Sequence, residues 1–62
     1  MIIVQETTKW DDNIPNHVYV LSDDKQSMYG YINSVTGKAV KFNGRRSFNS
    51  RFRTFRLIKK VS

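Results

Sequence analysis

The sequence contains no cysteine and only one histidine, His17. Without cysteine the chain can form neither a disulfide nor a thiolate metal site, and one imidazole is too few for a structural zinc site. Long apolar runs are missing as well. The apolar run at residues 1–4 is shorter than a signal-peptide core of about 7–15 residues, and no stretch approaches the roughly 20 residues of a membrane-spanning helix. We therefore expect a cytoplasmic protein with no cofactor, no metal and no membrane partner.

Carboxylates are absent from the last 38 residues. All five acidic residues lie in the first 24 positions beside the single base Lys9, which gives that segment a balance of −4. Residues 25–62 carry ten Lys and Arg, a balance of +10. Because so long a basic stretch cannot neutralise itself locally, it predicts an anionic partner, and phosphate is the commonest such anion.

Proline and glycine are scarce, with one Pro and three Gly in 62 residues, and no linker or repeat interrupts the chain. We expect a single small β domain over residues 1–62. A chain of this size buries only ~60% of its unfolded surface. Its stability must therefore come from a compact aliphatic and aromatic core, or from association into a homo-oligomer.

Alternating apolar and polar residues dominate what is present. They predict five strands, at residues 2–5, 17–21, 28–33, 38–42 and 54–61. Gly37 suits the left-handed position of a hairpin loop at residues 34–37. Asn43-Gly44 is the strongest short hairpin signal, because both residues tolerate positive φ. The pattern predicts a mostly β fold, a small five-stranded antiparallel β-barrel of SH3-like or OB-like topology.

The segment after residue 46 gives two signals. Phe48, Phe52 and Phe55 recur at spacings of four and three, which is helical, whereas residues 54–61 alternate like a strand. One helical turn near residues 47–52 that leads into the last strand satisfies both signals. The rival interpretation is a single basic amphipathic helix over residues 47–61, which its β-branched residues disfavour. We expect the three phenylalanines to pack in the core.

Residues 45–56 hold five arginines and three phenylalanines. The guanidinium group forms bidentate hydrogen bonds with phosphate and stacks on bases. A surface that arginine merely solvates would normally mix in glutamate, and this segment has none. With the lysines of the preceding strand, the candidate phosphate-binding residues are Lys38, Lys41, Arg45, Arg46, Arg51, Arg53 and Arg56.

Tyr29 and Tyr31 flank Gly30 in the third expected strand. Alternation places both rings on one face, and the glycine lets a base or a backbone approach, so both tyrosines are candidate stacking residues. The alternative is that one ring packs against the barrel and the other is merely exposed. The stretch of residues 28–32 locally resembles the aromatic-Gly-aromatic strand of cold-shock domains, which are OB-fold binders of single strands. The basic C-terminal segment has no counterpart there, and we assign no family from this stretch.

Catalysis has little support. The candidates for acid–base or metal chemistry are His17 and two aspartate pairs, at residues 11–12 and 23–24, and adjacent loop residues rarely point into one site. We expect no enzyme activity, no catalytic residue and no metal site. Trp10, in the polar loop of residues 6–16, is expected to close one end of the core with its indole N–H turned outward.

Taken together, these features predict a small basic module that binds DNA or RNA through the phosphate backbone with limited sequence specificity. The alternative is a protein-interaction module or inhibitor that docks on an acidic surface. Its type resembles the tiny proteins that phages make to redirect enzymes of the bacterial host cell. A third possibility is that the acids of the first third cover the basic face, within one monomer or between monomers. These acids are Asp11, Asp12, Asp23 and Asp24.

Overall fold

Five β-strands make up the regular structure in the computed structural model, which describes residues 1–9, 13 and 16–61. Each strand overlaps one of those expected from the sequence, so the prediction of a five-stranded antiparallel β fold is confirmed. The expectations for Trp10, Asp11 and Asp12 lie outside the described residues. The strands are β1 (Ile2–Glu6), β2 (Val18–Leu21), β3 (Ser27–Ile32), β4 (Ala39–Ser47) and β5 (Phe55–Lys60).

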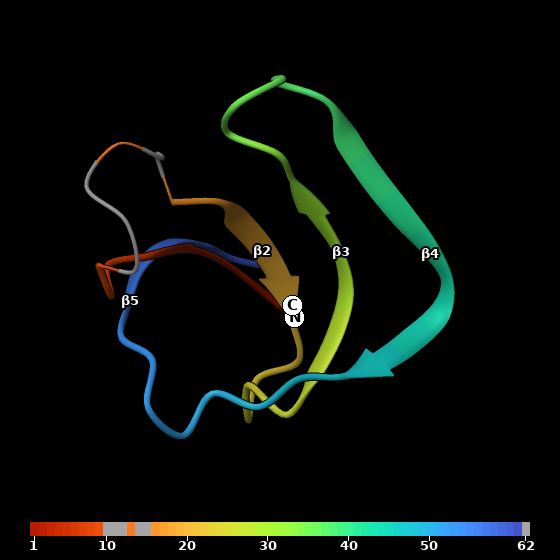
Figure 1. The fold of residues 1–62 in the computed structure, drawn as a ribbon. Coiled ribbons are helices and arrows are strands. Elements are labelled where there is room, and N and C mark those ends of the chain that lie inside the picture. Colours follow the sequence, from red (N-terminus) through yellow and green to blue (C-terminus); the bar gives the residue numbers. More distant parts are fainter. Residues whose placement is uncertain (10–12, 14–15, 62) are drawn as a thin grey trace.

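The strands form one antiparallel sheet in the order β4-β3-β2-β1-β5. Neighbours in the sheet are consecutive in the chain, except that β5 returns to pair with β1. The sheet is strongly curved, and the segment after β4 crosses its open side to reach β5 (Figure 1). Among the described residues β4 and β5 do not pair with each other, so the sheet is open and has two edges. The closed barrel expected from the sequence is therefore not established by strand pairing.

The core is small and lies against β1 and β2. Along β1 the residues Ile2, Val4 and Glu6 are buried, while the alternate residues are only half-buried, as period-two patterning requires. Leu21 is fully buried opposite Ile2, and Phe48 covers the same cluster from the segment that comes after β4. The partly buried side chains packed against this core are Tyr19, Met28 and Phe55.

The expected hairpin at Asn43-Gly44 is wrong, because both residues lie inside β4. β4 pairs with β3 on both sides of Asn43-Gly44. Between these two paired positions β3 advances by two residues and β4 by five. The extra residues make an irregular bulge, and Gly44 absorbs it with a positive φ of 92°. Asn43-Gly44 thus bends one strand and does not reverse the chain. The pairs that bracket the bulge are Gly30↔Lys41 and Met28↔Arg46.

The expected hairpin loop at residues 34–37 is confirmed. Gly37 has a φ of 74°, in the left-handed region. Its N–H donates to the Asn33 carbonyl at 2.7 Å, and the Asn33 N–H donates to the Lys38 carbonyl at 2.9 Å. These two bonds close the turn between β3 and β4.

The expected helical turn near residues 47–52 is wrong, since no described residue is helical. The Phe48 N–H donates to the Gln26 carbonyl at 2.8 Å, which ties the end of β4 to the start of β3. The chain then makes one tight turn, in which the Arg53 N–H donates to the Ser50 carbonyl at 3.1 Å. In the part of the chain that the structure describes, no helix is long and apolar enough to cross a membrane.

The three phenylalanines do not share one environment. The rings of Phe48 and Phe55 meet at a centroid distance of 5.9 Å, and Phe48 belongs to the core. Phe52 is 77% exposed and lies under the guanidinium of Arg51, 5.2 Å from its carbon to the ring centroid. The expectation of a core position is therefore wrong for Phe52. The three phenylalanines have helical spacing in the sequence, but the segment does not form a helix.

Candidate functional site

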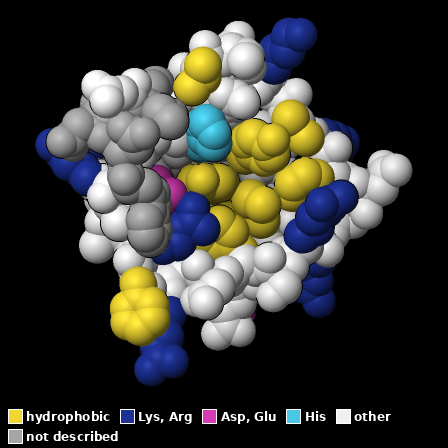
Figure 2. Space-filling view, in the orientation of Figure 1, with side chains coloured by type: hydrophobic (Ala, Val, Ile, Leu, Met, Phe, Trp, Pro, Cys, Tyr) yellow, Lys and Arg dark blue, Asp and Glu magenta, His cyan; other side chains and the backbone are white. Residues whose placement is uncertain are grey.

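A row of aromatic rings lines the concave side of the sheet. Successive ring centroids are 5.9, 5.3, 6.4 and 6.1 Å apart, within the range in which aromatic pairs attract. All but Phe48 are only half-buried, and hydrophobic side chains form a continuous surface on this open side (Figure 2). We call the five residues the aromatic row: Phe55, Phe48, Tyr19, Tyr31 and Phe42.

Strand register explains why these rings meet. Val4 is buried and pairs with Tyr19, and Tyr19 pairs with Tyr31, so all three side chains lie on the inner face. Tyr31 pairs in turn with Val40, and Phe42 lies two residues further along β4 on the same face. Neither Tyr19 nor Phe42 was among the candidate site residues predicted from the sequence. Alternation along β2 could have indicated Tyr19, because it places this ring on the face opposite to Val18 and Val20.

Two arginines lie over the row at different places. The guanidinium carbon of Arg46 is 4.5 Å from the Phe42 centroid. That of Arg53 is 4.4 Å from the Phe48 centroid and 5.2 Å from the Tyr19 centroid. All three distances are typical of cation–π contacts. The concave face therefore combines partly exposed rings with planar cations.

Arg53 is held by a buried acid. Its Nε donates to one carboxylate oxygen of Glu6 at 2.9 Å, and its Nη2 donates to the other at 2.6 Å and to the Tyr19 hydroxyl at 3.0 Å. Glu6 is only 3% exposed. These bonds to Glu6 raise the pKa of Arg53, and burial raises the pKa of Tyr19. Of the expected phosphate-binding residues, Arg53 is thus committed to a partner within the protein.

His17 lies beside the row, in contact with both of its tyrosines. Its ring stacks on Tyr31 at a centroid distance of 5.8 Å and an interplanar angle of 24°, and it meets Tyr19 edge-on at 6.4 Å. Its Nδ1 accepts the Ser34 N–H at 3.1 Å, which fixes the ring orientation. The sequence suggested His17 only as a weak catalytic candidate, and nothing in the sequence indicated this stacking position.

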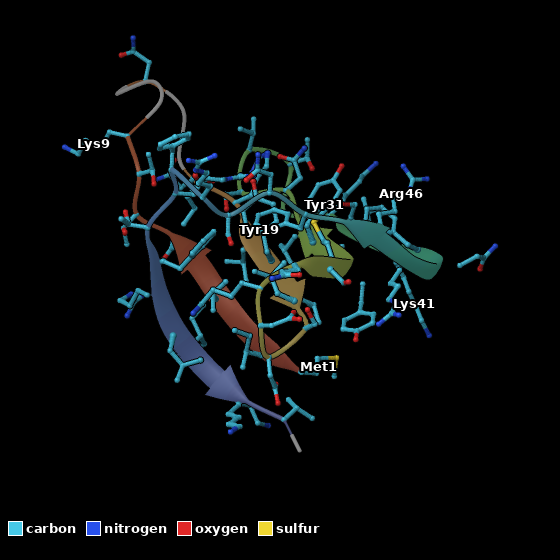
Figure 3. The ribbon with its side chains drawn as sticks, turned by 90° about the horizontal axis from the view of Figure 1, so that it is seen from below. Met1, Lys9, Tyr19, Tyr31, Lys41 and Arg46 are labelled. Atoms are coloured by element: carbon cyan, nitrogen blue, oxygen red, sulfur yellow. The ribbon has the colours of Figure 1, made fainter. Side chains whose placement is uncertain are left out.

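The other expected cations are exposed and lie mainly along β4. Arg46 and Lys41 lie on opposite sides of that strand (Figure 3), in agreement with their pairing to Met28 and Gly30. Arg56, on β5, donates to the Gln5 side-chain oxygen at 3.0 Å. Of these cations, Arg46 lies over a ring of the aromatic row, whereas Arg51 lies over the exposed Phe52. The exposed set is Lys38, Lys41, Arg45, Arg46, Arg51 and Arg56.

Tyr29 and Tyr31 do not act as one platform. The β2–β3 register shifts between Met28 and Gly30, so the alternation that would place both tyrosines on one face is interrupted at Tyr29. Tyr31 belongs to the aromatic row, whereas Tyr29 makes no ring contact among the described residues. The space beside Gly30 is filled by the protein itself, since a Cβ there would lie 2.5 Å from the Val40 carbonyl oxygen.

The described acids of the β2–β3 turn are engaged locally. Asp23 accepts from the Met1 ammonium at 2.7 Å, and Asp24 accepts from the Ser22 hydroxyl and, at 3.0 Å, from the Gln26 N–H. These contacts hold the pKa of both carboxyls below the ordinary value. Within the described residues neither aspartate forms an ion pair with an arginine. The acid that does so is Glu6, with Arg53.

Metal ligands are not assembled in the part of the chain that the structure describes, where no three His, Asp or Glu side chains gather. The concave face thus offers stacking, hydrogen-bonding and positive charge.

No protein-family model matches the sequence, and comparisons with curated proteins and with solved structures give no significant match.

Proposed function

We propose that this protein is a small nucleic-acid-binding module that contacts the phosphate backbone with limited sequence readout. The observation that supports it most directly is the position of Arg46, whose guanidinium lies over Phe42 of the aromatic row on an exposed edge strand. A planar cation beside half-exposed rings suits a phosphate and its neighbouring base. No acidic side chain occurs after residue 24 to compete for this cation from the basic half of the chain.

The exposed cations set the expected salt dependence. Arg53 is held by Glu6, so six of the expected phosphate-binding residues remain available. If all six contact phosphate, log K should fall with log salt concentration at a slope of about −4 to −5. Titration of labelled single-stranded and duplex probes by fluorescence anisotropy measures that slope. A slope near zero on both probes would overturn the proposal.

The two edge strands offer a matched pair of variants. Arg45/Arg46→Ala removes two adjacent charges from β4, and Lys59/Lys60→Ala removes two from β5. Both change the net charge equally. We expect the β4 variant to reduce the magnitude of the salt slope by about 1.5, since two phosphate contacts are lost. The β5 variant should change it by much less, and equal effects would argue against a site at β4.

For the finer topology we propose an SH3-like arrangement. The OB-fold is a Greek-key barrel, whereas here consecutive strands are neighbours and only the last returns beside the first. The curvature of the sheet is in keeping with a partly open barrel whose edges are β4 and β5 (Figure 1).

Exposed apolar residues on the β5 side favour a second candidate, a protein-interaction module. Phe52, Leu57 and Ile58 are 77%, 58% and 49% exposed. Exposed large apolar side chains are typical of anchors in protein interfaces, and the arginines and lysines next to them in the sequence would favour an acidic partner surface. A nuclease-treated pull-down should then recover one stoichiometric protein with the wild type and lose it with Phe52→Ser. Recovery that is unchanged by this substitution would exclude Phe52 as the anchor.

A further inference from the structure

Tyr31 is the ring at which the contacts of the concave face converge. Its neighbours are His17 at 5.8 Å, Phe42 at 6.1 Å and Tyr19 at 6.4 Å between ring centroids. These four rings keep contact with solvent, whereas Phe48 is buried. Phosphate binding needs hydrogen-bond donors and positive charge, so these partly exposed rings are available to another part of the ligand.

His17 adds a hydrogen-bond donor to this surface. Because Nδ1 accepts the Ser34 N–H, the proton of the neutral imidazole is on Nε2. In the described part of the chain no acceptor bonds Nε2, and the imidazole lies at the border of the hydrophobic surface (Figure 2). The ring can therefore donate to an acceptor on the edge of a base that stacks beside it.

A double helix does not suit this surface. Paired bases are stacked inside the duplex and present only their edges in the grooves. The partly exposed rings of the aromatic row can stack only on free base faces, and a duplex does not present these. Unpaired bases have free faces, and their flexible backbone can bring these faces onto partly exposed rings.

The geometry points to a single strand of DNA or RNA as the ligand, with bases stacked on Tyr31 and Phe42 and a phosphate at Arg46. This inference rests on the proposed function and narrows its substrate class. Arg46, 4.5 Å from the Phe42 centroid, lies where a base and its phosphate would meet. Lys41 lies on the other side of β4, so we do not expect it to contact the stacked bases (Figure 3).

Tyr31→Ala and Tyr29→Ala are a matched test, because the same residue type is removed from the same strand inside and outside the aromatic row. With oligo(dT) and oligo(rU) as probes, we expect Tyr31→Ala to weaken binding by about tenfold or more and Tyr29→Ala by less than about twofold. A duplex of equal length should bind at least about tenfold more weakly than either strand. The tighter of the two single-stranded probes identifies DNA or RNA as the preferred ligand.

A measurement on the wild type keeps the test independent of how well the variants fold. Titration with the tighter single-stranded probe should shift the amide resonances of His17, Tyr31 and Phe42 most strongly. Shifts confined to other residues, equal losses in the two tyrosine variants, or tighter binding of duplex would each overturn the inference. Those results would leave salt-dependent nucleic-acid binding in place. Absence of binding to every probe would remove the proposed function as well.

Discussion

Strands β1 and β4 differ in how far their side chains are buried. β1 is an inner strand, paired on both sides, and every second residue is buried. β4 is an edge strand of nine residues, and only Phe42 among them is not exposed. Stability is therefore concentrated at β1 and β2, while β4 presents side chains to the surroundings. One sheet therefore supplies both a core, at β1 and β2, and an exposed edge strand, β4, for which we propose a binding role.

Arg53 and Arg46 repeat this contrast on a smaller scale. Both guanidinium groups lie over rings of the aromatic row. Arg53 is bound to the buried Glu6, which makes it part of the packed region. Arg46 forms no ion pair among the described residues, and its charge is available to a ligand. The same residue type thus has a structural role in one region and a binding role proposed for the other.

The largest expected effect comes from Leu21→Ala. Leu21 is 0% exposed, so truncation should lower the free energy of unfolding by about 2–5 kcal/mol, through lost burial and the cavity left behind. Val40→Ala on β4, where Val40 is 37% exposed, should cost less than about 1 kcal/mol. Urea unfolding monitored by circular dichroism measures both. Similar costs at the two sites would abolish the distinction between the packed and the open region.

Arg53→Met is expected to cost about 2–3 kcal/mol, because it removes both charge-assisted hydrogen bonds to a buried carboxylate. The corresponding Arg46→Met should change stability by no more than about 0.5 kcal/mol. A double-mutant cycle with Glu6→Gln and Arg53→Met isolates the coupling by thermal or urea unfolding. Additive effects in that cycle would show that Glu6 and Arg53 have no interaction free energy, and hence that their ion pair does not stabilise the fold.

Gly30→Ala should disturb the junction between the two regions. The added Cβ would lie 2.5 Å from the Val40 carbonyl oxygen, a backbone atom that can move only with β4. We expect a loss of about 1–3 kcal/mol and faster amide exchange in β4 than in β1. Gly44→Ala serves as the comparison, since its Cβ would meet no atom within 4 Å and only its φ of 92° is strained. Uniform exchange across the sheet in Gly30→Ala would contradict local separation of β4.

The five strands were predictable because alternation is a local property that needs no knowledge of neighbours. Asn43-Gly44 misled for the opposite reason. A left-handed glycine serves a hairpin or a bulge equally well, and only the partner strand decides which is formed. The helical spacing of Phe48, Phe52 and Phe55 failed similarly. Long-range contacts place the first and third in or against the core and leave the second exposed.

The candidate site was predictable in composition and only partly in position. Charge alone indicated the cations of β4, but it could not separate Arg53, whose partner Glu6 is 47 positions away in sequence. Tyr31 lies among the rings of the aromatic row, whereas Tyr29 contacts none of them among the described residues. The bulge at β3 excludes Tyr29 from the row, and register across β2 brings in Tyr19. Such bulges depend on pairing across strands and leave no local signature.

The smallest expected effect concerns the turn that joins β2 to β3, next to the core. The Ser22 hydroxyl and the Gln26 N–H hold the pKa of the exposed Asp24 below its ordinary value of 3.8. The pKa of this carboxyl is lower in the folded protein than in the unfolded chain. It therefore stabilises the fold at pH values above the ordinary pKa. This stabilisation is lost as the pH falls through the lowered pKa of the folded protein. Asp24→Asn should therefore flatten the acid limb of a plot of Tm against pH.

Ser22→Ala removes the largest cause of that depression while keeping the carboxyl. It should flatten the acid limb partly, because the Gln26 N–H still favours the ionised form. Since Asp24 is held mainly by neutral donors, added salt should leave the difference between wild type and variant nearly unchanged. A difference that disappears in salt would assign the effect to the basic residues nearby. The acidic turn would then shield the open region after all.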